Sequence, residues 1–111
     1  MPHYYITLPD PKKARGSDPA LAFTALGAEG FAEQLRSAIT GTGLFDRWKA
    51  RLDDPDEVTA AMSATDPDAK VKGIQHDIRV DLEVDTTLPS QVLRQRLSLL
   101  AGNGWQLRDV T

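Results

Sequence analysis

The sequence of 111 residues contains no cysteine. This absence excludes disulfides, thiolate nucleophiles and metal sites built from thiolates. Histidine is scarce as well, with two residues, so a histidine-based metal site or catalytic triad has few ways to form. We therefore expect no metal, no cofactor and no catalytic constellation.

Long hydrophobic runs are also missing. No stretch approaches the ~18 consecutive apolar residues that a membrane-spanning helix requires. The first residues lack the basic stretch and apolar run of a secretory signal. We expect a protein that does not enter a membrane and that resides in the cytoplasm.

Neither sign of charge dominates, since 13 Lys and Arg face 16 Asp and Glu and give a net charge of −3. That balance is not typical of a nucleic-acid-binding protein, so nucleic acid is not an expected partner. The length and an apolar content of 41% suit one α+β domain, 1–111, with a single core.

The first quarter of the chain begins with a predicted strand. Residues 3–8 alternate between apolar and polar side chains and are rich in β-formers, and the proline that follows ends the strand. Residues 9–19 form a basic, proline-rich loop that is too polar to pack. Residues 20–27 fit either a short strand or the first turns of a helix.

The middle of the chain predicts helices. Apolar side chains recur at helical spacing over 29–40, and Gly41 is expected to cap this helix in the left-handed conformation. The apolar stripe continues over 44–52 in a second short helix or a kinked extension. Residues 53–69 are acidic and lack large apolar side chains, which predicts a mobile segment with a marginal helix at 55–63.

Residues 74–85 carry the clearest pattern, with apolar side chains at even positions and polar ones at odd positions. This period of two predicts one strand with an apolar and a polar face, in a mixed or antiparallel sheet covered on one side. A helix is expected over 88–102, with Arg94 and Arg96 pointing away from the core, and a final strand over 105–110.

These elements predict a two-layer α+β sandwich, ferredoxin-like or a variant of it, with the helices on one face of the sheet. The expected core comprises Tyr4, Ile6, Leu8, Phe31, Leu35, Ile39, Trp48, Ile78, Val80, Leu82, Val84, Leu93, Leu97, Leu100 and Trp105. The fold class by itself implies no function.

A charged stripe on the polar face of the predicted strand is the first candidate site. It comprises Asp77, Arg79, Asp81, Glu83 and Asp85. Carboxylates at this spacing serve acid–base chemistry or hold a cation only in a cleft, and this face is expected to be an open sheet. The structural interpretation is a solvated face, and the functional one is a surface that binds another protein.

Two further candidates carry less specific signals. Lys12, Lys13 and Arg15 place three cations in one loop, which suits an anion but lacks any phosphate-binding motif. His76 falls on the apolar face of the predicted strand, where a histidine satisfied by a backbone carbonyl is the structural interpretation. A general base or a pH-sensitive switch is the functional alternative.

The sequence therefore favours a small non-enzymatic module that binds another protein, with a homo-oligomer as one form of that partner. Binding of a phosphate-rich ligand or nucleic acid through Lys12–Arg15 is the alternative. A small enzyme that uses His76 with a nearby carboxylate is the third hypothesis.

Overall fold

The computed structural model describes residues 2–52 and 60–111 of the chain. In chain order the elements are β1 (His3–Leu8), α1 (Ala28–Thr40), α2 (Gly43–Lys49), the short 3₁₀ helix η2 (Ala60–Ser63), β2 (Lys70–His76), β3 (Arg79–Asp85), α3 (Ser90–Ala101) and β4 (Gln106–Val110). The first strand, the first helix, the last helix and the last strand are confirmed within two residues of their predicted ends.

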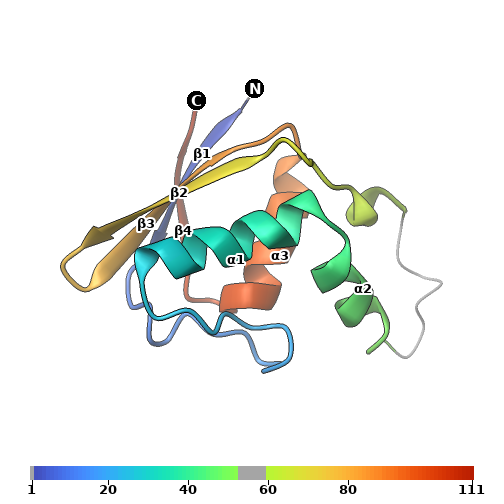
Figure 1. The fold of residues 1–111 in the computed structure, drawn as a ribbon, viewed down its shortest axis with the longest axis horizontal. Helices are drawn as coiled ribbons and strands as arrows, with labels where there is room; N and C mark the ends of the chain where they lie inside the picture. Colours follow the sequence, from blue (N-terminus) through green and yellow to red (C-terminus); the bar gives the residue numbers. More distant parts are fainter. Residues whose placement is uncertain (1, 53–59) are drawn as a thin grey trace.

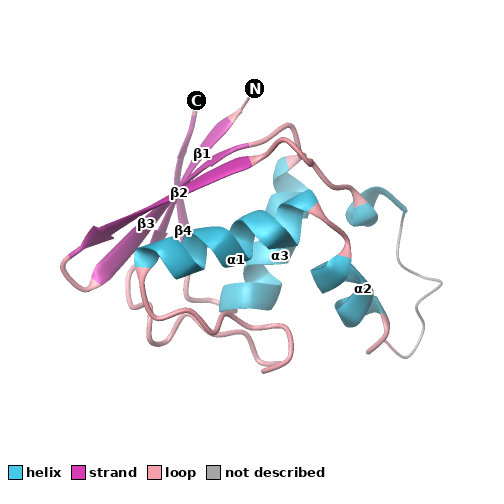
Figure 2. Cartoon of the chain, viewed as in Figure 1, coloured by secondary structure: helices cyan, strands magenta, loops and turns pink. Residues whose placement is uncertain are grey.

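The four strands form one antiparallel sheet in the order β2-β3-β1-β4. The helices of the described residues lie against one face of this sheet, and they leave the other face uncovered (Figures 1 and 2). The predicted α+β class is confirmed. None of the helices in the described part of the chain is long and apolar enough to cross a membrane.

The single long strand predicted in the second half of the chain is wrong, because this stretch is a hairpin. His76 pairs with Arg79, so Asp77 and Ile78 form a two-residue turn between β2 and β3. Asp77 has a φ of 58°, a left-handed conformation that Asp adopts more readily than most residues. Because a two-residue turn exchanges even and odd positions between the faces, Ile74 and His76 lie on the face opposite to the predicted one.

The core lies between the sheet and the helices. Its largest fully buried apolar side chains are Phe23, Phe31, Ile6, Leu8, Leu35, Ile39, Leu82, Leu93, Leu97, Val80 and Val84. Most of the predicted core is thus confirmed, with Trp48 and Trp105 partly buried against it. Ile78 is a wrong prediction, since it is 77% exposed at the tip of the hairpin.

Arg96 corrects another prediction, because its side chain is fully buried. Its Nε donates to the carbonyl of Ala38 at 3.3 Å, and its Nη2 donates to the carbonyl of Ala64 at 3.2 Å. Ala38 lies in the last turn of α1, where carbonyls lack partners within the helix. Gly41 does not supply the predicted left-handed cap, because it is extended with a φ of −137°. The cap therefore comes from another helix, and burial lowers the pKa of Arg96.

The connection between β1 and α1 is packed against α3, in contrast to the free polar loop predicted there. Ala14 is fully buried, and the backbone N–H groups of Gly16 and Phe23 both donate to the carbonyl of Leu100, at 3.0 and 2.8 Å. Residues 20–27 form neither the strand nor the helix that the sequence allowed. They place Phe23 in the core as part of an irregular segment.

Asp66 joins two connections that are far apart in the sequence, the one between η2 and β2 and the one between β3 and α3. Its carboxylate accepts hydrogen bonds from the backbone N–H of Thr87 at 2.9 Å and from the hydroxyl of Thr86 at 2.8 Å. These bonds favour the ionised form and lower the pKa of Asp66. Its own N–H donates to the carbonyl of Ile39 at 2.8 Å, which satisfies a second carbonyl at the end of α1.

The acidic segment predicted at 53–69 falls partly on residues 53–59, which lie outside the described residues. The helix expected at 55–63 overlaps η2 only at its end. The mobility of this segment and the single-domain interpretation of the chain stay predictions.

Candidate functional site

The uncovered face of the sheet carries most of the predicted partner-binding residues. Along β3 the buried residues alternate with outward-pointing ones, so Arg79, Asp81, Glu83 and Asp85 share this face. Asp77 is separated from them, since it lies in the hairpin turn. The outward residues of the three strands other than β4, called the open face below, are His3, Tyr5, Thr7, Lys70, Lys72, Ile74, His76, Arg79, Asp81, Glu83 and Asp85.

Asp81 is the most connected group on the open face. Its carboxylate accepts a hydrogen bond from the Thr7 hydroxyl at 2.8 Å and lies 3.2 Å from Nε2 of His76 and 3.3 Å from Nε of Arg79. The strand register explains this cluster, because Thr7 is opposite Asp81 and His76 is opposite Arg79. Groups from three strands, Thr7 of β1, His76 of β2 and Arg79 of β3, thus contact the Asp81 carboxylate.

A shallow cavity of about 460 Å³ surrounds this cluster. It is lined by Tyr5, Ile6, Thr7, Ile74, His76, Arg79, Asp81, Leu82, Glu83, Arg108, Asp109 and Thr111. The sequence predicted an open sheet without a cleft here, and strand alternation carries no information on such a hollow. Its volume is within the range of roughly 300–1,000 Å³ that holds small ligands, yet its floor is the sheet itself.

Two neighbouring columns of opposite charge run along the open face. On β2, Lys70 and Lys72 are exposed, and in the register they stand opposite Asp85 and Glu83 of β3. No ion pair joins either lysine to a carboxylate among the described residues, and the same holds for Glu83. Asp85 instead contacts the imidazole of His3. The face therefore presents unpaired charges of both signs.

The basic loop is not a single cluster of free cations. Lys12 and Lys13 are exposed, whereas Arg15 is partly buried. The Arg15 guanidinium donates to the carbonyl of Ala25 at 2.7 Å and lies 5.4 Å from the centre of the Phe31 ring. Arg15 thus holds the loop onto α1, and two lysines remain for an anion.

His76 has a carboxylate neighbour, as the third hypothesis requires. Its side chain is 49% exposed beside the cavity, and Nε2 faces Asp81. The nearby Thr7 hydroxyl donates to the same carboxylate and is not positioned as a nucleophile for the imidazole. Within residues 2–52 and 60–111, no group of three or more His, Asp and Glu side chains is placed to hold a metal ion.

The sequence analysis missed the β2 half of the open face. The available signal was the alternation of Lys70 and Lys72 with Val71, which extends the strand pattern upstream of Ile74. The turn gave no signal, because the residues at 77 and 78 are Asp and Ile and include neither glycine nor asparagine.

No protein-family model matches the chain, and neither a search of curated proteins nor a search of solved structures finds a significant match. Function is therefore inferred from the geometry of this chain.

Proposed function

We propose that the protein is a non-enzymatic interaction module that binds another protein through its open face. The binding partner is a second copy of the same protein. One observation carries the proposal, namely the two adjacent columns of opposite charge on β2 and β3, in which Lys70, Lys72 and Glu83 have no ion pair among the described residues. Lys70 and Lys72 form the positive column, and Glu83 with Asp85 forms the negative one. Adjacent columns of opposite sign are self-complementary, which is what a symmetric dimer interface requires.

The strand register defines the expected arrangement. A two-fold axis parallel to the strands and midway between β2 and β3 places the β2 of one copy over the β3 of the other. Because Lys72 and Glu83 are directly opposite each other in the sheet, they lie at the same height along the strands. Lys72 of each copy then meets Glu83 of the other, and the same holds for Lys70 and Asp85. Ile74 on β2 would be covered between the two sheets, whereas Tyr5 on β1 lies outside the overlap.

The expected affinity is low. Strand spacing and rise give the two overlapping strands, β2 and β3, an area of roughly 200 Å² per copy, well below that of a standard interface. Each exposed ion pair contributes about 0–1 kcal/mol, so the charges select the register more than they supply affinity. We expect a dissociation constant between ~10 µM and ~1 mM that rises with salt.

Sedimentation equilibrium with charge-swapped variants tests this proposal. Lys72→Glu or Glu83→Lys alone would place like charges opposite each other twice in each dimer and should abolish association. An equimolar mixture of the two variants restores both contacts and should associate again. Lys12→Glu, which changes an exposed cation away from the sheet, is the control and should dimerise like the original chain. A chain that stays monomeric at ~1 mM, or a mixture that does not recover, would contradict the proposal.

We also propose that the fold is a variant of the ferredoxin-like arrangement. The order of its main elements, β1-α1-β2-β3-α3-β4, and the sheet order β2-β3-β1-β4 support this assignment. The additions are α2, η2 and the long connection between β1 and α1. The cytoplasmic location stays a prediction.

The two other hypotheses have less support. Anion binding at 12–15 has two exposed lysines in its favour, with Arg15 engaged elsewhere. An enzyme using His76 has its contact with Asp81 in its favour and needs a nucleophile or an activated water. Loss of a measured activity in His76→Asn, with unchanged sedimentation, would favour the enzyme.

A further inference from the structure

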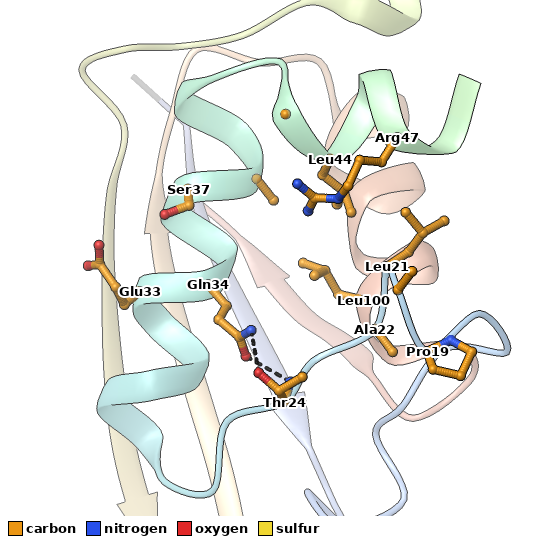
Figure 3. A pocket seen from close by; sticks show the side chains of 13 residues that line it. Pro19, Leu21, Ala22, Thr24, Glu33, Gln34, Ser37, Leu44, Arg47 and Leu100 are labelled. Atoms are coloured by element: carbon orange, nitrogen blue, oxygen red, sulfur yellow. Dashed lines mark hydrogen bonds between the residues drawn. The ribbon is translucent and has the colours of Figure 1, made fainter. Parts of the chain in front are cut away.

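A second cavity lies in the helical layer, away from the open face. It has a volume of about 400 Å³ and lies between the irregular 19–24 segment, α1 and the start of α2 (Figure 3). Its lining residues are Pro19, Ala20, Leu21, Ala22, Thr24, Glu33, Gln34, Ser37, Ala38, Gly43, Leu44, Arg47 and Leu100. This cavity, called the helical cleft below, has no role in the function proposed above.

Hydrogen bonds and an ion pair hold the walls of the helical cleft in place. At one end the Gln34 amide oxygen accepts from the N–H groups of Thr24 and Ala25 at 3.0 and 2.9 Å, and its nitrogen donates to the Thr24 hydroxyl (Figure 3). Next to the lining residue Pro19, the Asp18 carboxylate pairs with Nε of Arg51, which follows α2, at 2.9 Å. The irregular segment is therefore fixed to α1 and to the residues that follow α2, and the cleft is preformed.

The floor of the helical cleft is apolar. Leu21, Leu44, Leu100 and Ala38 line it, and each is 4% exposed. Water in contact with this floor has few hydrogen-bonding partners there. Burying a hydrocarbon group against these side chains is therefore favourable.

Arg47 supplies the charge of the helical cleft. Its guanidinium extends from α2 across the cleft toward α1 (Figure 3), and its Nη1 lies 3.6 Å from the position that a Cβ on Gly43 would take. Among the described residues Arg47 has no carboxylate partner and no hydrogen bond. The one carboxylate in the lining, Glu33, is paired with Arg36, which lowers the pKa of Glu33. The positive charge at the mouth is thus uncompensated.

We propose that the helical cleft binds a small carboxylic acid that carries a hydrocarbon chain or ring. Its carboxylate pairs with the Arg47 guanidinium, whose planar fork matches the two oxygens. Its hydrocarbon part covers Leu21, Leu44 and Leu100. A fully polar anion would gain nothing from the apolar side chains at the base of the cleft, and a neutral apolar molecule would leave Arg47 unpaired.

Titration of the full chain followed by amide NMR tests this proposal, with hexanoate as the probe. We expect saturable shifts at residues of the helical cleft with a dissociation constant near ~1 mM. Hexanamide, a neutral molecule of the same shape, should bind at least about tenfold more weakly than hexanoate. Arg47→Gln should weaken the binding of hexanoate to the same extent. Lys49→Gln, on the same helix and outside the lining, should leave the affinity unchanged.

A second variant separates loss of charge from loss of space. Ala22→Leu fills the helical cleft while keeping Arg47, and it should abolish hexanoate binding with a dispersed spectrum that shows an intact fold. Glu83→Lys on the open face should leave hexanoate binding unchanged, so this proposal and that of self-association fail independently. Equal affinity for hexanoate and hexanamide, shifts outside the cleft, or no saturable shift would overturn the assignment.

Discussion

Replacing Arg96 with methionine should lower the free energy of unfolding by ~2–4 kcal/mol. Methionine fills a similar space and removes the guanidinium, so the carbonyls of Ala38 and Ala64 lose their donors. A buried polar group left without a partner costs about 1–3 kcal/mol. The contact of the guanidinium with the Phe45 ring, at 5.1 Å from its centre, is lost as well.

One effect opposes this loss. Burial of the Arg96 guanidinium carries a desolvation cost, which is why its pKa is lowered, and methionine removes that cost. Replacing a buried charged cluster by apolar groups is often neutral when every partner is replaced. Here the partners are backbone carbonyls that cannot be replaced. Ala38 is 4% exposed, so water cannot take over the role of the donor there.

Urea and thermal unfolding measure the outcome. We expect the midpoint temperature of Arg96→Met to be roughly 8–16 °C below that of the original chain. The midpoint temperature of Arg96→Lys should be intermediate between the two. Lysine keeps the charge but lacks the planar fork that reaches two carbonyls at once. Arg94→Met, on the exposed side of the same helix, is the control and should change stability by less than about 0.5 kcal/mol. Unchanged stability of Arg96→Met would refute the reasoning, because it would show that desolvation cancels the capping bonds.

Three further predictions use the same unfolding measurements. Asp66→Asn should cost ~1–3 kcal/mol at neutral pH. Because the pKa of Asp66 is lowered in the folded chain, its contribution is complete above the ordinary value near 3.9 and is lost as the pH falls through the folded value. The gap to the original chain should therefore shrink below about pH 4. A gap that stays constant with pH would contradict this role. Gly73→Ala should cost about 3 kcal/mol, since a Cβ there would lie 2.2 Å from the carbonyl oxygen of Ala28; an unaffected midpoint would mean that β2 can move away from α1. Ile78→Thr at the exposed hairpin tip should stay within about 0.5 kcal/mol, whereas Val80→Ala should cost about 2 kcal/mol. Equal losses for these two variants would argue for the uninterrupted strand.

The candidate site illustrates how far local pattern reaches. The alternation at 79–85 identified the charged side of β3, because side-chain direction within one strand follows from its period of two. The same alternation gave the wrong face for Ile74 and His76, because a turn without glycine left the pattern unbroken. The contact of His76 with Asp81 depends on which strands are neighbours, and that information is absent from local spacing.

The helical cleft and the buried arginine show a second limit. Leu21, Arg47 and Leu100 come from three separate parts of the chain, and only the packing of an irregular segment on α1 and α3 brings them together. As a charged residue in an amphipathic helix, Arg96 is expected on the surface from the sequence pattern alone. Its burial follows from the unsatisfied carbonyls at the end of α1, which exist only once the two helices are packed.

The sequence by itself determined the α+β fold class and most of the helices and strands. Apolar spacing specifies which face of a strand or helix is buried, and the absence of cysteine and of long apolar runs limits the chemistry open to the chain. The tertiary structure alone decided the strand order, the hairpin, the charge columns of the open face and the helical cleft. These features depend on contacts between residues far apart in the chain, whereas local patterning records only whether a side chain prefers water or the core.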